Sequence, residues 1–200
     1  MPLIETGVAS AMREGQTQSG DRHVVKSFID GVLVAVVDGL GHGHEAAAAA
    51  KTAITILESH AGEPLISLLR RSHETLRFTR GVVMSVACFS APEGSMTWLG
   101  VGNVEGVLLR ANPKASRHGE SLLLLGGVVG SKLPLLHAFT VPVARDDTLI
   151  FTTDGIESGF TENLTLSDPP QKTAEKIIAM HSKKTDDALV LVARFVGCRP

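Results

Sequence analysis

The stretch Val32-Leu-Val-Ala-Val-Val-Asp38-Gly39-Leu-Gly-His-Gly-His-Glu-Ala-Ala-Ala-Ala-Ala50 decides the fold. Its six apolar residues, rich in valine, are typical of a strand that is buried on both faces. Asp38 stands at the end of this strand, a glycine-rich turn follows, and an alanine-rich helix begins within six residues. The rigid strand fixes the carboxylate, and Gly39 leaves room for the close approach of a metal ion or a substrate.

Two further acidic positions stand at the edges of strand-like runs far along the chain. Asp154 follows Leu149-Ile-Phe-Thr-Thr153, and Asp186 and Asp187 directly precede Ala188-Leu-Val-Leu-Val-Ala193. Carboxylate oxygens are the ligands that hard divalent cations prefer in proteins. The pattern therefore predicts a cluster of oxygen ligands built from segments that are distant in the sequence.

The composition is typical of one soluble globular domain. The chain has 200 residues, 44% of them hydrophobic, and no linker or repeat divides it, so residues 1–200 are expected to form a single domain. A net charge of −2, no tyrosine and one tryptophan give no broad attraction to nucleic acid or anionic membranes and few side chains for base stacking.

The cellular compartment is predicted from the absence of targeting, membrane-spanning and disulfide features in the sequence. The N-terminus has no signal-peptide features, and no apolar window is long enough to span a bilayer. Cys88 lies in an apolar run and Cys198 in the tail, which argues against a disulfide framework. We therefore expect a cytoplasmic protein with no nucleic-acid partner and no membrane partner.

Periodicity and turn signals predict a mixed α and β protein. Helices are expected at residues 45–59, from Pro64 through Leu76, and at residues 171–181, and Asp30-Gly31 marks a hairpin. Strands are expected at 23–28, 32–37, 82–89, 96–101, 104–110, 122–125, 137–143, 148–153 and 189–195. Short turns between consecutive strands make neighbours antiparallel, so two packed sheets covered by helices accommodate the pattern.

Three other interpretations of single motifs are weaker. In a dinucleotide-binding fingerprint the third glycine of Gly39-Leu-Gly-His-Gly43 would come one residue later, and Asp38 would repel the pyrophosphate. His42 and His44 lack a matching pair of zinc ligands and are interpreted as loop histidines near the site. Asp146-Asp147 precedes a strand without a glycine partner and is interpreted as a solvated turn.

The acidic motifs, taken in order, resemble those of a known enzyme family. The segments that carry the resemblance are Gly20-Asp21, Val37-Asp-Gly-Leu-Gly-His-Gly43, Phe151-Thr-Thr-Asp-Gly155 and Thr185-Asp-Asp-Ala188, with Thr79–Ser85 and Val101–Val104 in support. Together they resemble metal-dependent PP2C-type serine/threonine phosphatases, in particular the bacterial SpoIIE-like branch and its short single-domain feedback phosphatases of the stressosome. The resemblance extends from about Gly20 to Phe195 and implies an α+β fold, an α/β/β/α sandwich of two mainly antiparallel sheets.

The resemblance also implies a role for each aspartate. Asp38 would bridge two divalent cations, Mn²⁺ or Mg²⁺, held between the sheets. Asp154 and Asp186 would complete the site of one cation, and the Gly39 carbonyl would bind the other. Asp21 would act through metal-bound water. Asp187 stands where an asparagine is common in eukaryotic members, and it would either support the metal ligands from behind or simply cap the strand.

Phosphate orientation is the least defined part of the implied site. The phosphate-binding arginine of eukaryotic members has no clear counterpart, and Arg13 and Arg22 are the candidates. Cysteine-based phosphatase chemistry is disfavoured, because neither cysteine begins a phosphate-binding loop that ends in arginine.

The expected function is hydrolysis of phosphoserine or phosphothreonine in a protein substrate. Two cations can activate a water molecule and neutralise phosphoryl oxygens, which is the chemistry that catalytic Asp38, Asp154 and Asp186 would support. The resemblance implies stressosome scaffold proteins as substrates, with dephosphorylation resetting a stress signal. The alternative is a catalytically silent binding module of the same fold that docks on a phosphorylated assembly.

Overall fold

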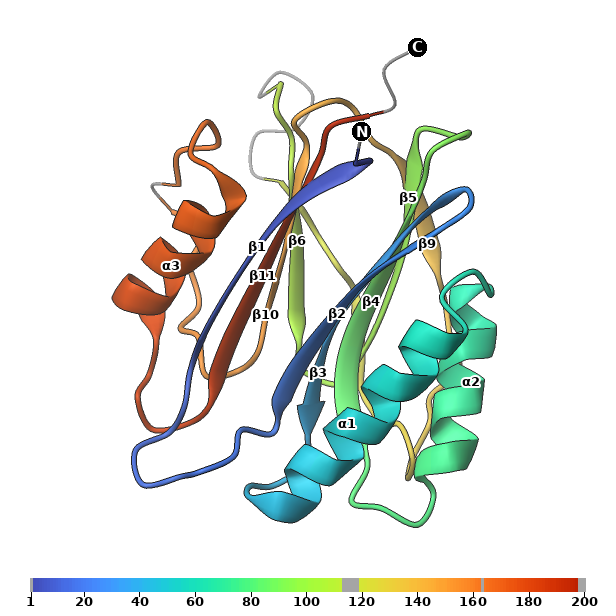
Figure 1. The fold of residues 1–200 in the computed structure, drawn as a ribbon, viewed down its shortest axis with the longest axis vertical. Helices are drawn as coiled ribbons and strands as arrows, with labels where there is room; N and C mark the ends of the chain where they lie inside the picture. Colours follow the sequence, from blue (N-terminus) through green and yellow to red (C-terminus); the bar gives the residue numbers. More distant parts are fainter. Residues whose placement is uncertain (1, 113–118, 163, 198–200) are drawn as a thin grey trace.

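The computed structural model describes residues 2–112, 119–162 and 164–197, and it forms four layers (Figure 1). Sheet A consists, from edge to edge, of β1 (Ile4–Ala11), β11 (Ala188–Phe195), β10 (Thr148–Thr152), β6 (Glu105–Leu109) and β7 (Glu120–Ser121). Sheet B consists of β2 (Asp21–Phe28), β3 (Gly31–Gly39), β4 (Val82–Ser90), β5 (Ser95–Val101) and β8 (Leu124–Leu125), with β9 (Phe139–Pro142) also paired to β5. Helices α1 (His44–Ser59) and α2 (Leu65–Leu76) cover sheet B, and α3 (Pro170–His181) covers sheet A. The predicted α+β sandwich is confirmed.

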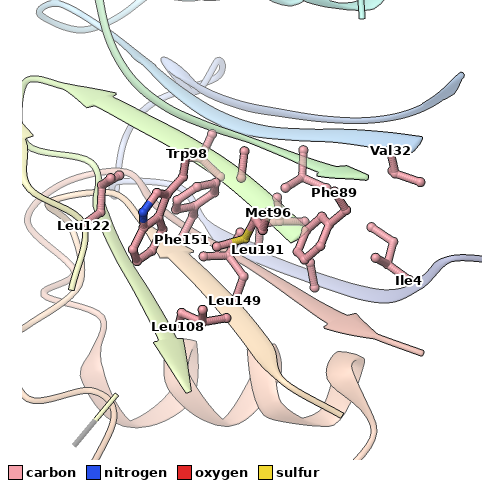
Figure 2. Close-up of a cluster of buried hydrophobic side chains, with 14 of the residues drawn as sticks. Ile4, Val32, Phe89, Met96, Trp98, Leu108, Leu122, Leu149, Phe151 and Leu191 are labelled. Atoms are coloured by element: carbon pink, nitrogen blue, oxygen red, sulfur yellow. The ribbon is translucent and has the colours of Figure 1, made fainter. Parts of the chain in front are cut away.

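Three apolar clusters hold these layers together. One lies between the two sheets (Figure 2). In this cluster the Phe89 and Phe195 rings stack with centroids 6.1 Å apart. A second cluster joins sheet B to α1 and α2, and a third joins sheet A to α3. Both faces of each sheet are therefore covered, which explains why every residue of Ala188–Phe195 is buried and why all but Arg194 are apolar.

Strand β3 is central in sheet B, as its sequence predicts. Seven successive residues, Gly31–Val37, are buried, and the strand pairs antiparallel with both β2 and β4. A dinucleotide-binding fingerprint requires a parallel βαβ unit, so this topology removes that alternative. The absence of a side chain at Gly39 also has a packing consequence. A Cβ atom there would lie 2.1 Å from the Ala46 carbonyl oxygen, so Gly39 admits the backbone of α1.

The β2–β3 hairpin turns where Asp30-Gly31 predicts. Its ladder runs from Phe28 opposite Gly31 at the turn to Asp21 opposite Asp38 at the open end. Two carboxylates that are seventeen positions apart in the sequence thus become direct cross-strand neighbours, because each lies at the same end of the hairpin.

Two local expectations were wrong. Of the strand predicted at residues 122–125, only Leu124–Leu125 is a strand, β8 in sheet B, because the chain crosses over from β7 (Glu120–Ser121) in sheet A just before it. Leu122 lies in the inter-sheet core at this crossing, while Leu123 is exposed.

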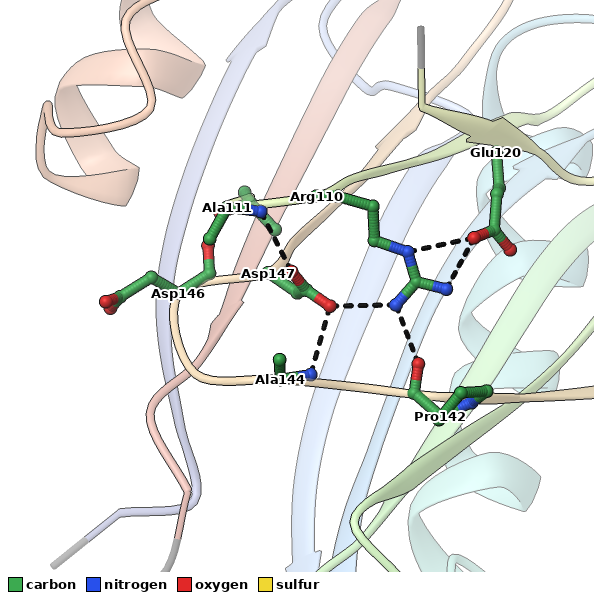
Figure 3. Close-up of polar contacts among 8 residues, drawn as sticks. Arg110, Ala111, Glu120, Pro142, Ala144, Asp146 and Asp147 are labelled. Carbon is green, nitrogen blue, oxygen red and sulfur yellow. Dashed lines mark hydrogen bonds and ion pairs between the residues drawn. The ribbon is translucent and has the colours of Figure 1, made fainter. Parts of the chain in front are cut away.

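Asp147 is not part of a solvated turn, because its side chain is buried (Figure 3). Its carboxylate accepts hydrogen bonds from the Arg110 guanidinium at 2.8 Å and from the Ala111 and Ala144 amides at 2.9 and 3.0 Å. Arg110 also pairs with Glu120, so this network joins β6, β7 and the entrance to β10.

Two observations bear on the compartment and on the thiols. Within the described ranges, the helices are too short or too polar to cross a membrane. Cys88 on β4 is a free thiol, and Cys198 lies outside the described residues.

Candidate active site

A cavity of about 550 Å³ opens at the end of the sandwich where β3 and β10 finish. Five acidic side chains from both sheets line it, namely Asp21, Asp38, Asp154, Asp186 and Asp187. All five aspartates that the sequence selected are therefore brought to one place. Gly39 follows Asp38 in β3 but does not line the cavity. A Cβ atom at residue 39 would project toward α1.

Each aspartate occupies an end of its strand. Asp21 begins β2 and Asp38 lies one residue before the end of β3, so both come from sheet B. Asp154 follows β10 by two residues, and Asp186 and Asp187 directly precede β11, so these three come from sheet A. The cavity is thus formed where the two sheets face each other.

Thr153 connects the two sheets beneath the cavity. Its hydroxyl donates to Asp21 Oδ2 at 2.7 Å and accepts from the Leu189 amide at 2.9 Å. The hydroxyl is buried, so Asp21 has one fixed oxygen and one that remains on the cavity side. Thr153 belongs to the Phe151–Gly155 motif, but the sequence alone assigns it no role.

Asp187 holds the connection between β1 and β2. Its two carboxylate oxygens accept from the backbone amides of Arg13 and Gly20, each at 2.9 Å. Both oxygens are therefore occupied by N–H donors from one loop. This placement gives Asp187 a positioning role, in contrast to the more accessible Asp154 and Asp186.

Asn103 is a site residue that sequence reasoning missed. It lines the cavity, and its side-chain amide donates to Asp154 Oδ2 at 2.8 Å. Asn103 follows Gly102 in the β5–β6 turn, where φ is +99° and a Cβ would lie 2.1 Å from Val83 Cγ1. The quoted hairpin motif Val101–Val104 therefore contained the signal, although nothing in the sequence connected it to Asp154.

The electrostatics of the cavity reflect this crowding of carboxyl groups. Burial raises the pKa of Asp38 to about 8, and the neighbouring carboxylates of Asp21, Asp154 and Asp186 add to the shift. Burial also raises the pKa of Asp21 to about 7, while the hydrogen bond from Thr153 opposes the increase. In the absence of a cation, the site therefore favours protonated carboxyl groups.

The pH dependence of stability follows from these shifts. Both folded-state pKa values lie above the ordinary value of 3.8, so between about pH 4 and pH 8 the folded protein binds more protons than the unfolded chain. The stabilising contribution is complete below about pH 4 and is lost as the pH rises through 7 to 8. In EDTA we expect the thermal midpoint to fall by several degrees from pH 5 to pH 9.

Asp38→Asn is the control for this expectation. The variant removes one of the two titrating groups, so its thermal midpoint should fall less over the same pH range. Differential scanning calorimetry of both proteins in EDTA measures this. An identical pH profile for the variant and the wild type would contradict the assignment of the effect to the cavity.

The donor set fits hard divalent cations. Among the described residues, no three His, Cys, Asp or Glu side chains already form a compact metal site. The cavity nevertheless offers carboxylate oxygens and no thiolate, and the repulsion that raises the pKa of Asp38 is the repulsion that a cation would relieve. Such a set favours Mg²⁺ or Mn²⁺ over softer metals.

The arginine and histidine candidates from the sequence differ in where they lie relative to the cavity. Arg13 lines the cavity, whereas the Arg22 guanidinium donates to the Asp21 backbone carbonyl at 2.9 Å and is not a lining residue. His42 lines the cavity at the tip of the glycine-rich turn, and His44 begins α1 beside a smaller pocket next to it. Both are loop or helix-entry histidines near the site, as the sequence predicts.

Comparison with known proteins identifies related chains. The family described as stage II sporulation protein E (SpoIIE) matches residues 30–196. The phosphoserine phosphatase RsbX of Bacillus subtilis (strain 168) is 27% identical over 155 residues, which are 76% of this chain and 75% of that protein.

Two solved structures have a similar fold. A chain from a study of the bacterial stressosome as a modular system adapted to control secondary messenger signaling is 29% identical with a TM-score of 0.86, covering 96% of this chain and 99% of that one. The crystal structure of RsbX in complex with magnesium is 23% identical with a TM-score of 0.83, covering 96% and 95%.

Proposed function

The chain belongs to the SpoIIE family of PP2C-type phosphatases, and from this premise we propose that it is a divalent-metal-dependent phosphatase of phosphoserine and phosphothreonine in proteins. The observation that carries the proposal is the convergence of five aspartates from two sheets on one cavity. The similarity to the phosphoserine phosphatase RsbX supports the reaction, and the RsbX structure with magnesium supports the choice of cation.

Within this proposal the aspartates divide into two groups. Asp38, Asp154 and Asp186 are the proposed ligands, and the Gly39 carbonyl is the proposed backbone ligand. Asp38 is the ligand proposed to be shared, since it lies opposite Asp21 and interacts electrostatically with Asp154 and Asp186 from the other sheet. When bound, Mn²⁺ or Mg²⁺ would supply the positive charge that activates water and neutralises phosphoryl oxygens.

The other polar residues hold the ligands in position. Asn103 fixes one oxygen of Asp154, which leaves the second oxygen for coordination. Thr153 likewise fixes one oxygen of Asp21, whose second oxygen can orient a water molecule. Asp187 secures the loop that carries Arg13. The protein thus holds carboxylate oxygens in fixed orientations toward the cations that would contact a phosphate in the cavity.

Arg13 is the proposed phosphate-orienting residue, because it is the cavity-lining member of the two arginine candidates. We expect Arg13→Ala to raise KM for p-nitrophenyl phosphate by about tenfold, since one charge-assisted contact with the substrate is lost. Arg22→Ala serves as the matched control and should leave KM within about twofold. Steady-state kinetics at saturating Mn²⁺ measure both, and equal values of KM for the two variants would contradict the assignment.

One assay tests the proposed activity itself. The full chain is incubated with p-nitrophenyl phosphate and a panel of Mg²⁺, Mn²⁺, Ca²⁺ and Zn²⁺, and EDTA provides the metal-free reference. We expect turnover with Mn²⁺ or Mg²⁺ that EDTA abolishes. Absence of turnover with every metal would favour the alternative, a catalytically silent module that docks on a phosphorylated assembly.

The substrate class is the finer part of the proposal. We propose that the substrates are phosphorylated stressosome scaffold proteins and that their dephosphorylation resets a stress signal. Support comes from the similarity to RsbX and to a chain solved in a study of the bacterial stressosome. Release of phosphate from a purified phosphorylated scaffold protein, followed with time at fixed Mn²⁺, tests this part separately.

A further inference from the structure

The connection between α2 and β4, residues 77–81, displays a fully solvent-exposed aromatic ring on an ordered backbone. Phe78 is 98% exposed. The Thr79 amide and hydroxyl both donate to the Leu76 carbonyl, at 2.9 and 2.8 Å, and the Gly81 amide donates to the Thr79 hydroxyl at 3.0 Å. These bonds fix the loop, so the exposure of Phe78 is a property of the folded chain.

This connection packs against two of the residues that line the catalytic cavity. The Leu40 amide donates to the Gly81 carbonyl at 3.1 Å, and Arg80 packs so closely on Gly41 that a Cβ there would lie 2.7 Å from its guanidinium. Leu40 and Gly41 both line the cavity. Figure 1 shows the α2–β4 connection at the same end of the sandwich as the start of α1.

We propose that residues 77–81 are a docking surface for the folded phosphoprotein substrate, with Phe78 as the apolar contact. This inference rests on the proposed function. A phosphoserine that enters the cavity from a folded domain brings the surrounding surface of that domain over the rim. A small phosphate ester or a short peptide reaches the cavity without covering Phe78.

The charges beside Phe78 define the complementary surface. Arg77 and Arg80 flank it, and their side chains are 61% and 53% exposed. Each has one carboxylate neighbour, Glu74 and Glu45 respectively, so the loop is not a strongly basic patch. Aromatic and arginine side chains are enriched in the cores of protein interfaces. The partner surface that fits is an apolar depression bordered by acidic side chains, next to the phosphorylated residue.

A second exposed side chain provides a matched control. Ile29 is 97% exposed and lies at the turn of the β2–β3 hairpin, at the opposite end of the ladder from Asp21 and Asp38. Single exposed apolar residues are common on protein surfaces and need no function. Phe78 differs from Ile29 in its position beside the cavity, and the comparison isolates this difference.

The first experiment compares Phe78→Ala and Ile29→Ala on two substrates at equal Mn²⁺. For a phosphorylated stressosome scaffold protein, we expect Phe78→Ala to lower kcat/KM by about tenfold and Ile29→Ala to leave it within twofold. For p-nitrophenyl phosphate, both variants should match the wild type. Equal loss on the two substrates, or no loss on the folded protein, would overturn the docking surface.

The second experiment does not depend on turnover. A photoreactive phenylalanine analogue is placed at position 78 in the Asp38→Asn background and irradiated with the phosphorylated scaffold protein. Cross-linking to the scaffold supports the proposal, even if the chain proves to be catalytically silent. Cross-linking only to a second copy of this chain, or to nothing, overturns it, while the p-nitrophenyl phosphate assay reports independently on the proposed activity.

Discussion

Asp38→Asn is expected to lower kcat/KM for p-nitrophenyl phosphate by at least about 1000-fold, which corresponds to roughly 4 kcal/mol of transition-state stabilisation. Asp38 lies opposite Asp21 in the β2–β3 ladder and interacts electrostatically with Asp154 and Asp186. The neutral amide would remove one negative charge that the proposed cations share. Steady-state rates at limiting and saturating Mn²⁺ measure the loss.

The fold of this variant should remain intact. Removing one of several crowded carboxyl groups relieves repulsion in the metal-free protein, so its near-ultraviolet circular dichroism should match that of the wild type. Asp30→Asn is the matched control, because it makes the same chemical change at the far end of the same hairpin and retains an Asn-Gly turn. Near-normal turnover of Asp38→Asn at limiting Mn²⁺ would exclude Asp38 as the shared ligand.

Gly155→Ala is expected to give the largest loss of stability. A Cβ at residue 155 would lie 1.9 Å from the Asp187 carbonyl oxygen and 2.8 Å from its carbonyl carbon, so a backbone segment rather than a flexible side chain must move. We expect a loss of about 3 kcal/mol in the free energy of unfolding, measured by urea denaturation. Because the same shift separates Asp154 from Asp186, the variant should also require more Mn²⁺ for half-maximal activity.

Gly62→Ala is the control for this substitution. A Cβ at residue 62 would meet only the Phe28 ring, at 3.7 Å, which is an ordinary van der Waals distance. Its free energy of unfolding should therefore remain within about 1 kcal/mol of the wild-type value. Equal stabilities of the two alanine variants would show that the β10–α3 connection can relax around the added carbon.

The elements that the sequence predicted well are those with strong local patterns. The apolar run before Asp38, the alanine-rich helix and the Asp30-Gly31 hairpin were all predicted close to their observed bounds. Asp38, Asp154, Asp186 and Asp187 were found for a related reason, since each stands at an abrupt change between a strand-like apolar run and a turn, whereas Asp21 was found only through the resemblance to the phosphatase family. Such boundaries are visible without knowledge of tertiary structure.

The features that could not be predicted depend on contacts between distant segments. Asp147 resembles a surface residue until Arg110, 37 positions earlier, is placed beside it. The passage of residues 120–125 from β7 in sheet A to β8 in sheet B depends on a crossing that hydrophobicity does not mark. Asn103 likewise gains its role only when the β5–β6 turn meets the end of β10.

Both sheets contribute carboxylates to the cavity, and the inter-sheet cluster around Phe89 and Phe195 sets the distance between these sheets. The affinity for the proposed cations should therefore be thermodynamically coupled to the packing of side chains that do not line the cavity. A substitution that empties space in this cluster would act on the proposed catalysis at long range, by changing the separation of Asp38 from Asp154. The hydrophobic core of this fold would then also determine the geometry of the proposed metal site.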